Sequence, residues 1–252
     1  MSEKLILITN DDGVHADGLK ALQKALSVLG RVIVVAPHHE RSGTSQALTV
    51  DAPLRVKELE KDFYSVSGYP ADCVCAAMYG ILPRRPDLTV SGINKGANMG
   101  IDLYYSGTVA GIRQSVMDGT KGFAISLVID TNKTTFYWQD AADYAKIFAE
   151  KMLAKGYKQG GFLNINYPNI PKKDVKGTKI TKTGDRRYFN DLKWDKDLKG
   201  QDYCWLWGDY NSFTPIEDTD SQAISEDYIS VTPVALDVND YKMMEELKEW
   251  NL

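Results

Sequence analysis

Hydrophobic positions in the first two thirds of this chain follow two alternating spacings. Short apolar runs between turn residues are typical of buried strands, and apolar residues repeated every three to four positions are typical of amphipathic helices. We therefore predict alternating strands and helices up to about residue 165, a pattern that favours an α/β fold with a mostly parallel sheet. The predicted strands are 5–8, 31–36, 87–94 and 122–128, and the predicted helices are 17–29, 69–81 and 140–153.

The remaining segments show different patterns. Residues 48–67 alternate apolar and polar positions, which predicts short antiparallel strands. Beyond Lys172 we predict strands at 179–183, 203–207 and 228–233, with no helix before a terminal one at 240–252. The expected organisation is a catalytic core of residues 1–170 and a β-hairpin and C-terminal oligomerisation region of residues 171–252, from which part of strands 223–235 returns to the core.

A dense aromatic segment lies near the C-terminal third of the chain. Four aromatic residues, two of them Trp, lie between Tyr203 and Tyr210. A lone hairpin cannot bury that much apolar area, so we expect this segment to contact another subunit.

Composition narrows the class of protein. The 252 residues are 43% hydrophobic and 25% charged with a net charge of -4, which is ordinary for a globular protein and gives no reason to expect wrapping of nucleic acid. No apolar run approaches a membrane span, and residues 5–8 are too short for a signal peptide, so a cytoplasmic protein is expected. The three Cys residues, at 73, 75 and 204, lack zinc or redox spacing and are expected to be small buried thiols.

Polar side chains follow three of the predicted strands at the point where each strand ends. Asp11 and Asp12 follow the first strand, the loop with Ser42 follows the second, and Asn94 ends the third. The carboxyl ends of parallel strands meet at one rim of a sheet, so these groups should gather there. Adjacent carboxylates repel unless a cation or a shared proton lies between them. All the donors are oxygens, which favours Mg²⁺, Mn²⁺ or Ca²⁺ over zinc; a strand end with a helix cap is the alternative for the Asp pair alone.

Two further segments offer anion-binding donors beside that predicted cation. The loop 95–100 is rich in Gly and Asn, which let backbone N–H groups approach a ligand closely. Ser106 or Thr108 is placed where a helix should begin, and a helix N-terminus favours phosphate. A cation site next to two such elements indicates phosphoryl chemistry. His15, His38 and His39 are expected to have surface or supporting roles.

The ordered motifs along the chain resemble the SurE, or stationary-phase survival, family of metal-dependent nucleoside monophosphate phosphatases. The resemblance implies a Rossmann-like three-layer core, a projecting β-hairpin, a terminal helix, and a homodimer or homotetramer in which a C-terminal element is exchanged between subunits. The motifs that carry it are 8–13 (ITNDDG), 36–43 (APHHERSG), 68–73 (GYPADC), 90–100 (VSGINKGANMG), 105–111 (YSGTVAG), 218–225 (DTDSQAIS) and 228–233 (YISVTP).

The resemblance also implies roles for individual residues. One divalent cation per subunit, Mg²⁺ or Mn²⁺ with Ca²⁺ as a third candidate, would be held by Asp11, Asp12, Ser42 and Asn94. Asp11 and Asp12 would be the catalytic residues. The phosphate would be bound by Asn10, Asn98, Ser106, Gly107 and Thr108. Residues 45–47 and Tyr105 depart from the pattern of some family members, and both departures bear on the contacts to the nucleoside.

The expected reaction is hydrolysis of nucleoside 5′-monophosphates, with 3′-monophosphates as a further substrate class, by metal-activated water. Two alternatives stay open: a phosphatase that forms a covalent aspartyl phosphate, and a non-enzymatic, metal-dependent nucleotide sensor. A dinucleotide oxidoreductase is disfavoured, because residues 10–15 replace the glycine fingerprint that a pyrophosphate needs after the first strand.

Overall fold

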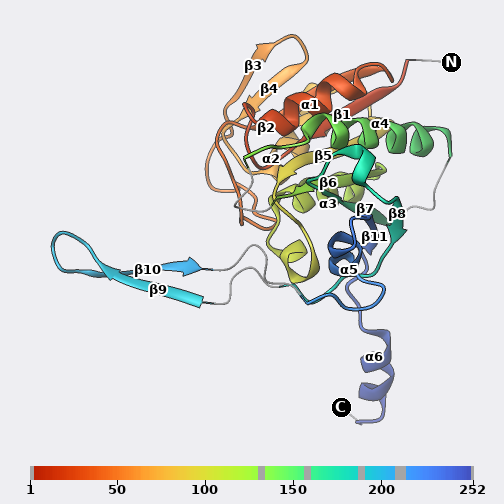
Figure 1. The fold of residues 1–252 in the computed structure, drawn as a ribbon. Coiled ribbons are helices and arrows are strands. Elements are labelled where there is room, and N and C mark those ends of the chain that lie inside the picture. Colours follow the sequence, from red (N-terminus) through yellow and green to blue (C-terminus); the bar gives the residue numbers. More distant parts are fainter. Residues whose placement is uncertain (1–2, 130–133, 156–159, 187–190, 208–213, 251–252) are drawn as a thin grey trace.

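A nine-stranded sheet forms the centre of the molecule (Figure 1). The computed structural model describes residues 3–129, 134–155, 160–186, 191–207 and 214–250. The strand order is β3-β4-β2-β1-β5-β6-β7-β11-β8. The strands of this sheet are β1 (Leu5–Thr9), β2 (Arg31–Pro37), β3 (Val56–Glu60), β4 (Phe63–Val66), β5 (Leu88–Lys95), β6 (Gly122–Val128), β7 (Gly161–Pro168), β8 (Thr178–Ile180) and β11 (Ile229–Ala235).

The sheet is mostly parallel, which confirms the predicted α/β class. Strands β4, β2, β1, β5, β6 and β7 pair in parallel, and β1 lies between β2 and β5. Only β3 and β11 run antiparallel to a neighbour, at β4 and β7 respectively, and β8 pairs in parallel with β11. Because β1, β2 and β5 are adjacent and parallel, their carboxyl ends open at the same rim.

Helices cover both faces of the sheet and produce three layers (Figure 1). Side chains alternate between the two faces of a strand, so β1 contributes to both faces of the sheet. Ile6 and Ile8 pack in the core beneath α1 and α4, while Leu5 and Leu7 pack beneath α2. A third apolar cluster joins α3 to β6 and β7. The covering helices are α1 (Asp17–Leu26), α2 (Pro70–Ala76), which continues as a π-helical turn (Ala77–Ile81), α3 (Gly107–Met117) and α4 (Trp138–Ala154).

The segment after Lys172 contains a helix that the sequence pattern failed to predict. The structure has α5 (Asp220–Ser225), so the expectation of no helix before the terminal one was wrong. Six residues are too few to show a repeated apolar spacing. This helix is held by tertiary contacts, because Asp220 at its first turn accepts hydrogen bonds from the backbone N–H groups of Gly100 (3.0 Å) and Gly184 (2.9 Å). Strands β8 and β11 lie in the central sheet, and the domain boundary at residue 170 stays a prediction.

Two C-terminal elements extend away from the core (Figure 1). One is the antiparallel hairpin of β9 (Asp191–Lys196) and β10 (Asp202–Trp207), and the other is α6 (Tyr241–Lys248), the predicted terminal helix. Cys204 is exposed on the hairpin, so the expectation of a buried thiol was wrong there. Tyr210 and the side chain of Trp207 lie outside the described residues.

None of the helices in the described part of the chain has both the length and the hydrophobicity that crossing a membrane requires.

Candidate functional site

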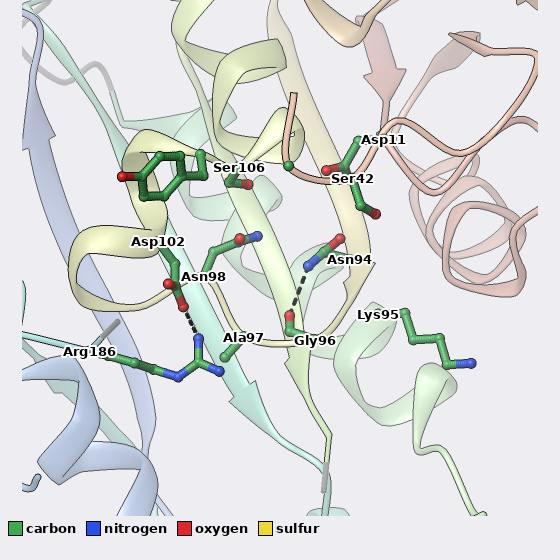
Figure 2. Close-up of a pocket in the computed structure, with 12 residues that line it drawn as sticks. Asp11, Ser42, Asn94, Lys95, Gly96, Ala97, Asn98, Asp102, Ser106 and Arg186 are labelled. Atoms are coloured by element: carbon green, nitrogen blue, oxygen red, sulfur yellow. Dashed lines mark hydrogen bonds and ion pairs between the residues drawn. The ribbon is translucent and has the colours of Figure 1, made fainter. Parts of the chain in front are cut away.

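A pocket opens at the rim where β1, β2 and β5 end (Figure 2). Its volume is about 130 Å³. Five of the residues singled out in the sequence contribute to its wall: Asp11, Ser42, Asn94, Asn98 and Ser106. The structure therefore brings together groups from three strand ends and from the start of α3. The other lining residues are Gly43, Lys95, Gly96, Ala97, Asp102, Tyr105 and Arg186.

Asp11 is the buried carboxylate of this pocket, with 3% of its surface exposed. Its Oδ1 accepts a hydrogen bond from the Thr108 hydroxyl, and its backbone carbonyl accepts one from the Arg41 N–H at 2.7 Å. Gly107, the first residue of α3, allows this close approach. A Cβ at that position would lie 2.8 Å from the Asp11 Cβ, nearer than side chains tolerate. In the structure both Gly107 and Thr108 pack against Asp11, and their expected contact with the phosphate stays a prediction.

Asp12 lies beside Asp11 but lines a second, adjacent cavity. Its Oδ2 accepts a hydrogen bond from the Lys95 backbone N–H at 3.0 Å, which ties the end of β1 to the end of β5. Asn10, immediately before the pair, is completely buried and donates from Nδ2 to the Gly13 carbonyl at 3.0 Å. Its Oδ1 has no hydrogen-bond partner among the described residues.

The carboxyl groups of Asp11 and Asp12 both have raised pKa values. Burial is the main cause of the rise for Asp11, to about 6, and the hydrogen bonds from Thr108 oppose it. Burial is again the main cause for Asp12, whose pKa rises to about 7, and the neighbouring Asp11 charge adds to it. The Glu40 carboxylate raises both values further. A bound cation would stabilise the charged forms of both carboxyls, the buried Asp11 and the half-buried Asp12.

Ser42 and Asn94 complete an all-oxygen donor set with these carboxylates. Ser42 is exposed and donates from Oγ to Glu40 Oε1 at 2.9 Å. Asn94 lies where the pairing of β5 with β6 shifts register, and its Nδ2 donates to the Gly96 carbonyl at 2.9 Å. That bond turns the Asn94 oxygen toward the side of the pocket with Asp11 and Ser42 (Figure 2). In the described chain, no three His, Cys, Asp or Glu side chains form a metal-binding group. Carboxylate, hydroxyl and amide oxygens, the donors that converge here, are the ligands that a hard divalent cation prefers.

Asn98 is held rigidly in the wall of the pocket. Its backbone N–H donates to Asn166 Oδ1 at 2.9 Å, and its side-chain Nδ2 donates to Ser126 Oγ at 2.8 Å. Its carbonyl accepts from the side chains of Asn164 and Asn166 on β7, at 2.8 and 2.9 Å. Of the two predicted N-cap candidates, Ser106 is the N-cap of α3, and its Oγ accepts the Val109 N–H at 3.1 Å. The pocket thus has preorganised polar walls.

Sequence reasoning did not identify a charged pair on the far side of this pocket. Asp102 and Arg186 form an ion pair in which the Arg186 side chain is only 2% exposed (Figure 2). The Arg186 carbonyl also accepts the Ile101 N–H at 2.9 Å. Arg186 lies 84 positions after Asp102 and directly precedes the hairpin region, so no local pattern could have placed it here. Glu40 was likewise missed as a neighbour of both aspartates.

Comparison with known proteins gives a consistent result. The profile of the family described as survival protein SurE matches residues 6–190. The 5'-nucleotidase SurE of Syntrophotalea carbinolica is 42% identical over 248 residues, which cover 98% of each chain. The 5'-nucleotidase SurE of Pelobacter propionicus is 41% identical over 245 residues, covering 97% of this chain and 98% of the relative.

A solved structure extends the similarity to the whole fold. The crystal structure of the SurE protein from Aquifex aeolicus superposes with a TM-score of 0.87 at 36% sequence identity, covering 98% of this chain and 100% of that one. The resemblance drawn from the ordered motifs is thereby confirmed. This chain belongs to the SurE family.

Proposed function

We propose that this chain is a divalent-metal-dependent phosphomonoesterase that hydrolyses nucleoside 5′-monophosphates to nucleoside and phosphate. The observation that carries the proposal is the convergence of Asp11, Ser42 and Asn94 with Asn98 and Ser106 in one pocket. An oxygen donor set for a cation then lies next to the start of a helix, which favours phosphate. The relatives that cover nearly the whole chain are named 5'-nucleotidase SurE, which supports the same reaction class.

The residues that would hold the cation are Asp11, Asp12, Ser42 and Asn94. A divalent cation bound there would supply neutralisation of phosphate charge and activation of the attacking water. Mg²⁺ and Mn²⁺ both suit this donor set, with Ca²⁺ as a third candidate, and we propose one ion per subunit.

The chain itself orients the reacting groups. The Thr108 hydrogen bond fixes the direction of the Asp11 carboxylate, and the Lys95 N–H fixes that of Asp12. Asn98, anchored on β7, presents its side chain to the phosphate without having to reorganise during the reaction. Asp11 or Asp12 accepts the proton of the attacking water in this scheme. Because these contacts recognise a phosphate and not the sugar position that bears it, we extend the proposal to 3′-monophosphates.

The test is turnover of AMP and GMP by the purified chain with Mn²⁺ or Mg²⁺, before and after chelation. Asp12→Asn should abolish phosphate release. Asp87→Asn is the matched control, because Asp87 accepts the Leu5 N–H at 2.8 Å at the opposite end of β1. This control should fold and retain activity. Nucleotide binding without turnover in the wild-type chain would favour the sensor. A hydroxylamine-labile acyl phosphate on Asp11 or Asp12 would favour the covalent mechanism.

We further propose that the hairpin mediates a homodimer or homotetramer with exchange of a C-terminal element. The register of β9 and β10 places Trp194 opposite Cys204 and Leu192 opposite Leu206, so these four side chains share one face. Trp194 and Leu206 are 68% and 67% exposed. An apolar face of this kind on a two-stranded hairpin is typical of a subunit contact. The cytoplasmic location expected from the sequence stays a prediction.

A further inference from the structure

A second cavity, lined by Asp12, adjoins the pocket lined by Asp11, Ser42 and Asn94, which we call the phosphate pocket. Its volume is about 270 Å³. Lys95 lines both cavities, and its backbone contact with Asp12 lies between them. Figure 2 shows the Lys95 side chain extending away from Asn98 and Arg186, toward the outside of the phosphate pocket. A substrate whose phosphate is held at Asp11 and Asp12 therefore has this second space within reach.

The size of the phosphate pocket makes such a space necessary. Pockets that enclose a whole small-molecule ligand are typically about 300–1,000 Å³, and the phosphate pocket has about 130 Å³. Its Arg186 side chain is only 2% exposed and is paired with Asp102, so it offers little surface on which a flat base could stack. The two cavities together reach the range for a complete nucleotide.

The second cavity has an aromatic wall formed by Phe136 and Trp138. Their ring centroids are 5.8 Å apart with an angle of 34° between the planes. Both side chains are half-buried and pack against the core on one side, so their remaining surface is available to a ligand. Stacking on aromatic side chains is the general way in which proteins bind bases without reading their sequence.

This wall is preorganised by contacts from other elements. The Asn169 side chain accepts the Tyr137 N–H at 3.0 Å and donates to the Thr135 carbonyl at 2.8 Å, which pins the backbone on both sides of Phe136. Trp138 lies against α1 at Gly18. A Cβ at Gly18 would lie 3.0 Å from the Trp138 ring and 2.2 Å from the Ile93 carbonyl, so only glycine permits this packing.

Polar and charged groups surround the aromatic wall. The Lys95 ammonium lies 5.2 Å from the Phe136 ring centroid, so the ring already binds a cation on one face. His15, Asp17 and Glu40 are exposed at the edge of the cavity. Their carboxylates and imidazole can accept hydrogen bonds from ribose hydroxyls and from base N–H groups. A flat ring with polar edges is the ligand that this combination fits.

We propose that this cavity is the nucleoside subsite, in which Phe136 and Trp138 stack against the base while the phosphate lies at Asp11 and Asp12. This inference rests on the proposed nucleotidase function and adds specificity-determining residues to it. The base displaces the Lys95 ammonium from the Phe136 ring, and Lys95, which lines both cavities, then lies between base and phosphate.

The test compares two substrates that differ only by the base: AMP and ribose 5-phosphate. Phe136→Leu keeps apolar volume and removes the aromatic face. We expect it to raise KM for AMP by about fivefold or more, since stacking contributes about 1–3 kcal/mol per base, and to leave both kinetic constants for ribose 5-phosphate nearly unchanged. Phe136→Tyr retains the ring and should restore the KM for AMP.

Two further variants serve as matched controls. Phe148→Leu alters a half-buried aromatic residue on the same helix as Trp138 that packs on Phe123 with a centroid distance of 5.3 Å, away from the cavity. This substitution should change the KM for AMP and the KM for ribose 5-phosphate to the same extent. Tyr105→Leu removes the aromatic residue of the phosphate pocket, which is 49% exposed. It should have a smaller effect on the KM for AMP than Phe136→Leu.

The outcomes of these assays separate the two proposals. Absence of turnover of both substrates by the wild-type chain with every divalent cation contradicts the proposed function itself. Turnover of AMP with a Phe136→Leu effect that is equal for both substrates, or absent, overturns the nucleoside subsite and leaves the nucleotidase proposal intact. If Tyr105→Leu raises the KM for AMP more than Phe136→Leu does, the base lies in the phosphate pocket, and the proposed nucleoside subsite is overturned.

Discussion

The hydroxyl of Thr108 donates a hydrogen bond to the carboxylate of Asp11, across 97 positions of sequence. This contact joins the start of α3 to the end of β1, and Thr108 is completely buried from solvent. It holds one oxygen of a buried carboxylate in a defined direction and favours its charged form. The helix thus supports the predicted cation site as well as the predicted phosphate site.

Thr108→Val should weaken cation binding. The substitution keeps the shape of the side chain and removes the hydroxyl, so Asp11 loses a buried hydrogen bond of the charged type, which contributes about 1.5–3 kcal/mol. The apparent Kd for Mn²⁺, measured by calorimetry, should rise by about tenfold or more. Thr108→Ser retains the donor and should bind Mn²⁺ nearly as tightly as the wild-type chain. Equal Mn²⁺ affinity in the valine variant would contradict this role for Thr108.

The metal-free chain should lose stability as the pH rises. The pKa values of Asp11 and Asp12 are raised from 3.8 to about 6 and about 7 in the folded state, so the folded chain binds these protons more tightly than the unfolded one. The stabilisation is complete below about pH 4 and disappears as the pH rises through 6 to 7. In urea titrations with a chelator, we expect the free energy of unfolding to decrease by several kcal/mol from pH 4 to pH 8.

Asp12→Asn provides the internal comparison for that pH dependence. An amide does not titrate, so the free energy of unfolding of the variant should decrease much less between pH 4 and pH 8. The variant should also be more stable than the metal-free wild-type chain at pH 8. Saturating Mn²⁺ should remove the decrease in the wild-type chain, because a cation bound to ionised carboxylates stabilises the folded state. If the free energy of unfolding of the variant depends on pH as steeply as that of the wild-type chain, Asp12 is not the titrating group.

Gly107→Ala should impair activity far more than an ordinary helix substitution. Alanine would place a Cβ 2.8 Å from the Asp11 Cβ and 2.9 Å from its Oδ2, so α3 or the carboxylate must shift. A displacement of about 1 Å in a catalytic site costs about a hundredfold in rate. Gly80→Ala is the matched control, because nothing lies within 4 Å of the added atom. The measurement is phosphate release from AMP at saturating Mn²⁺, and similar rates for the two variants would contradict the packing argument.

The apolar face of the hairpin should determine the oligomeric state. Trp194→Ser combined with Leu206→Ser removes two exposed apolar side chains from the face that also carries Leu192 and Cys204. Light scattering coupled to gel filtration should show a smaller assembly for this variant than for the wild-type chain. Val28→Ser, at a 73% exposed apolar position just after α1 and outside the hairpin, should leave the assembly unchanged. A wild-type chain that is monomeric throughout the accessible concentration range would contradict the subunit contact.

Local patterns in the sequence were sufficient for the framework of this protein. Short apolar runs and helical spacing predicted most strands and helices of the parallel core, because burial on a sheet or a helix imposes its own period on the residues; strand β7, which pairs in parallel with β6, was not predicted. The same logic placed Asp11, Ser42 and Asn94 at one rim, since adjacent parallel strands end together. The ordered motifs then identified the SurE family, which the comparisons confirm. The individual roles of these site residues stay predictions.

Only the tertiary structure decided the contacts between residues far apart in the chain. It paired Thr108 with Asp11, brought Arg186 to Asp102, and placed Phe136 in the same cavity as Asp12. It also stabilised α5 through contacts of Asp220 with two distant backbone segments. Periodicity tells which face of an element is buried, but it contains no information on which distant side chain lies against it. The packing of the layers decides which distant side chains meet. The supporting contacts of the site and the second cavity follow from that packing.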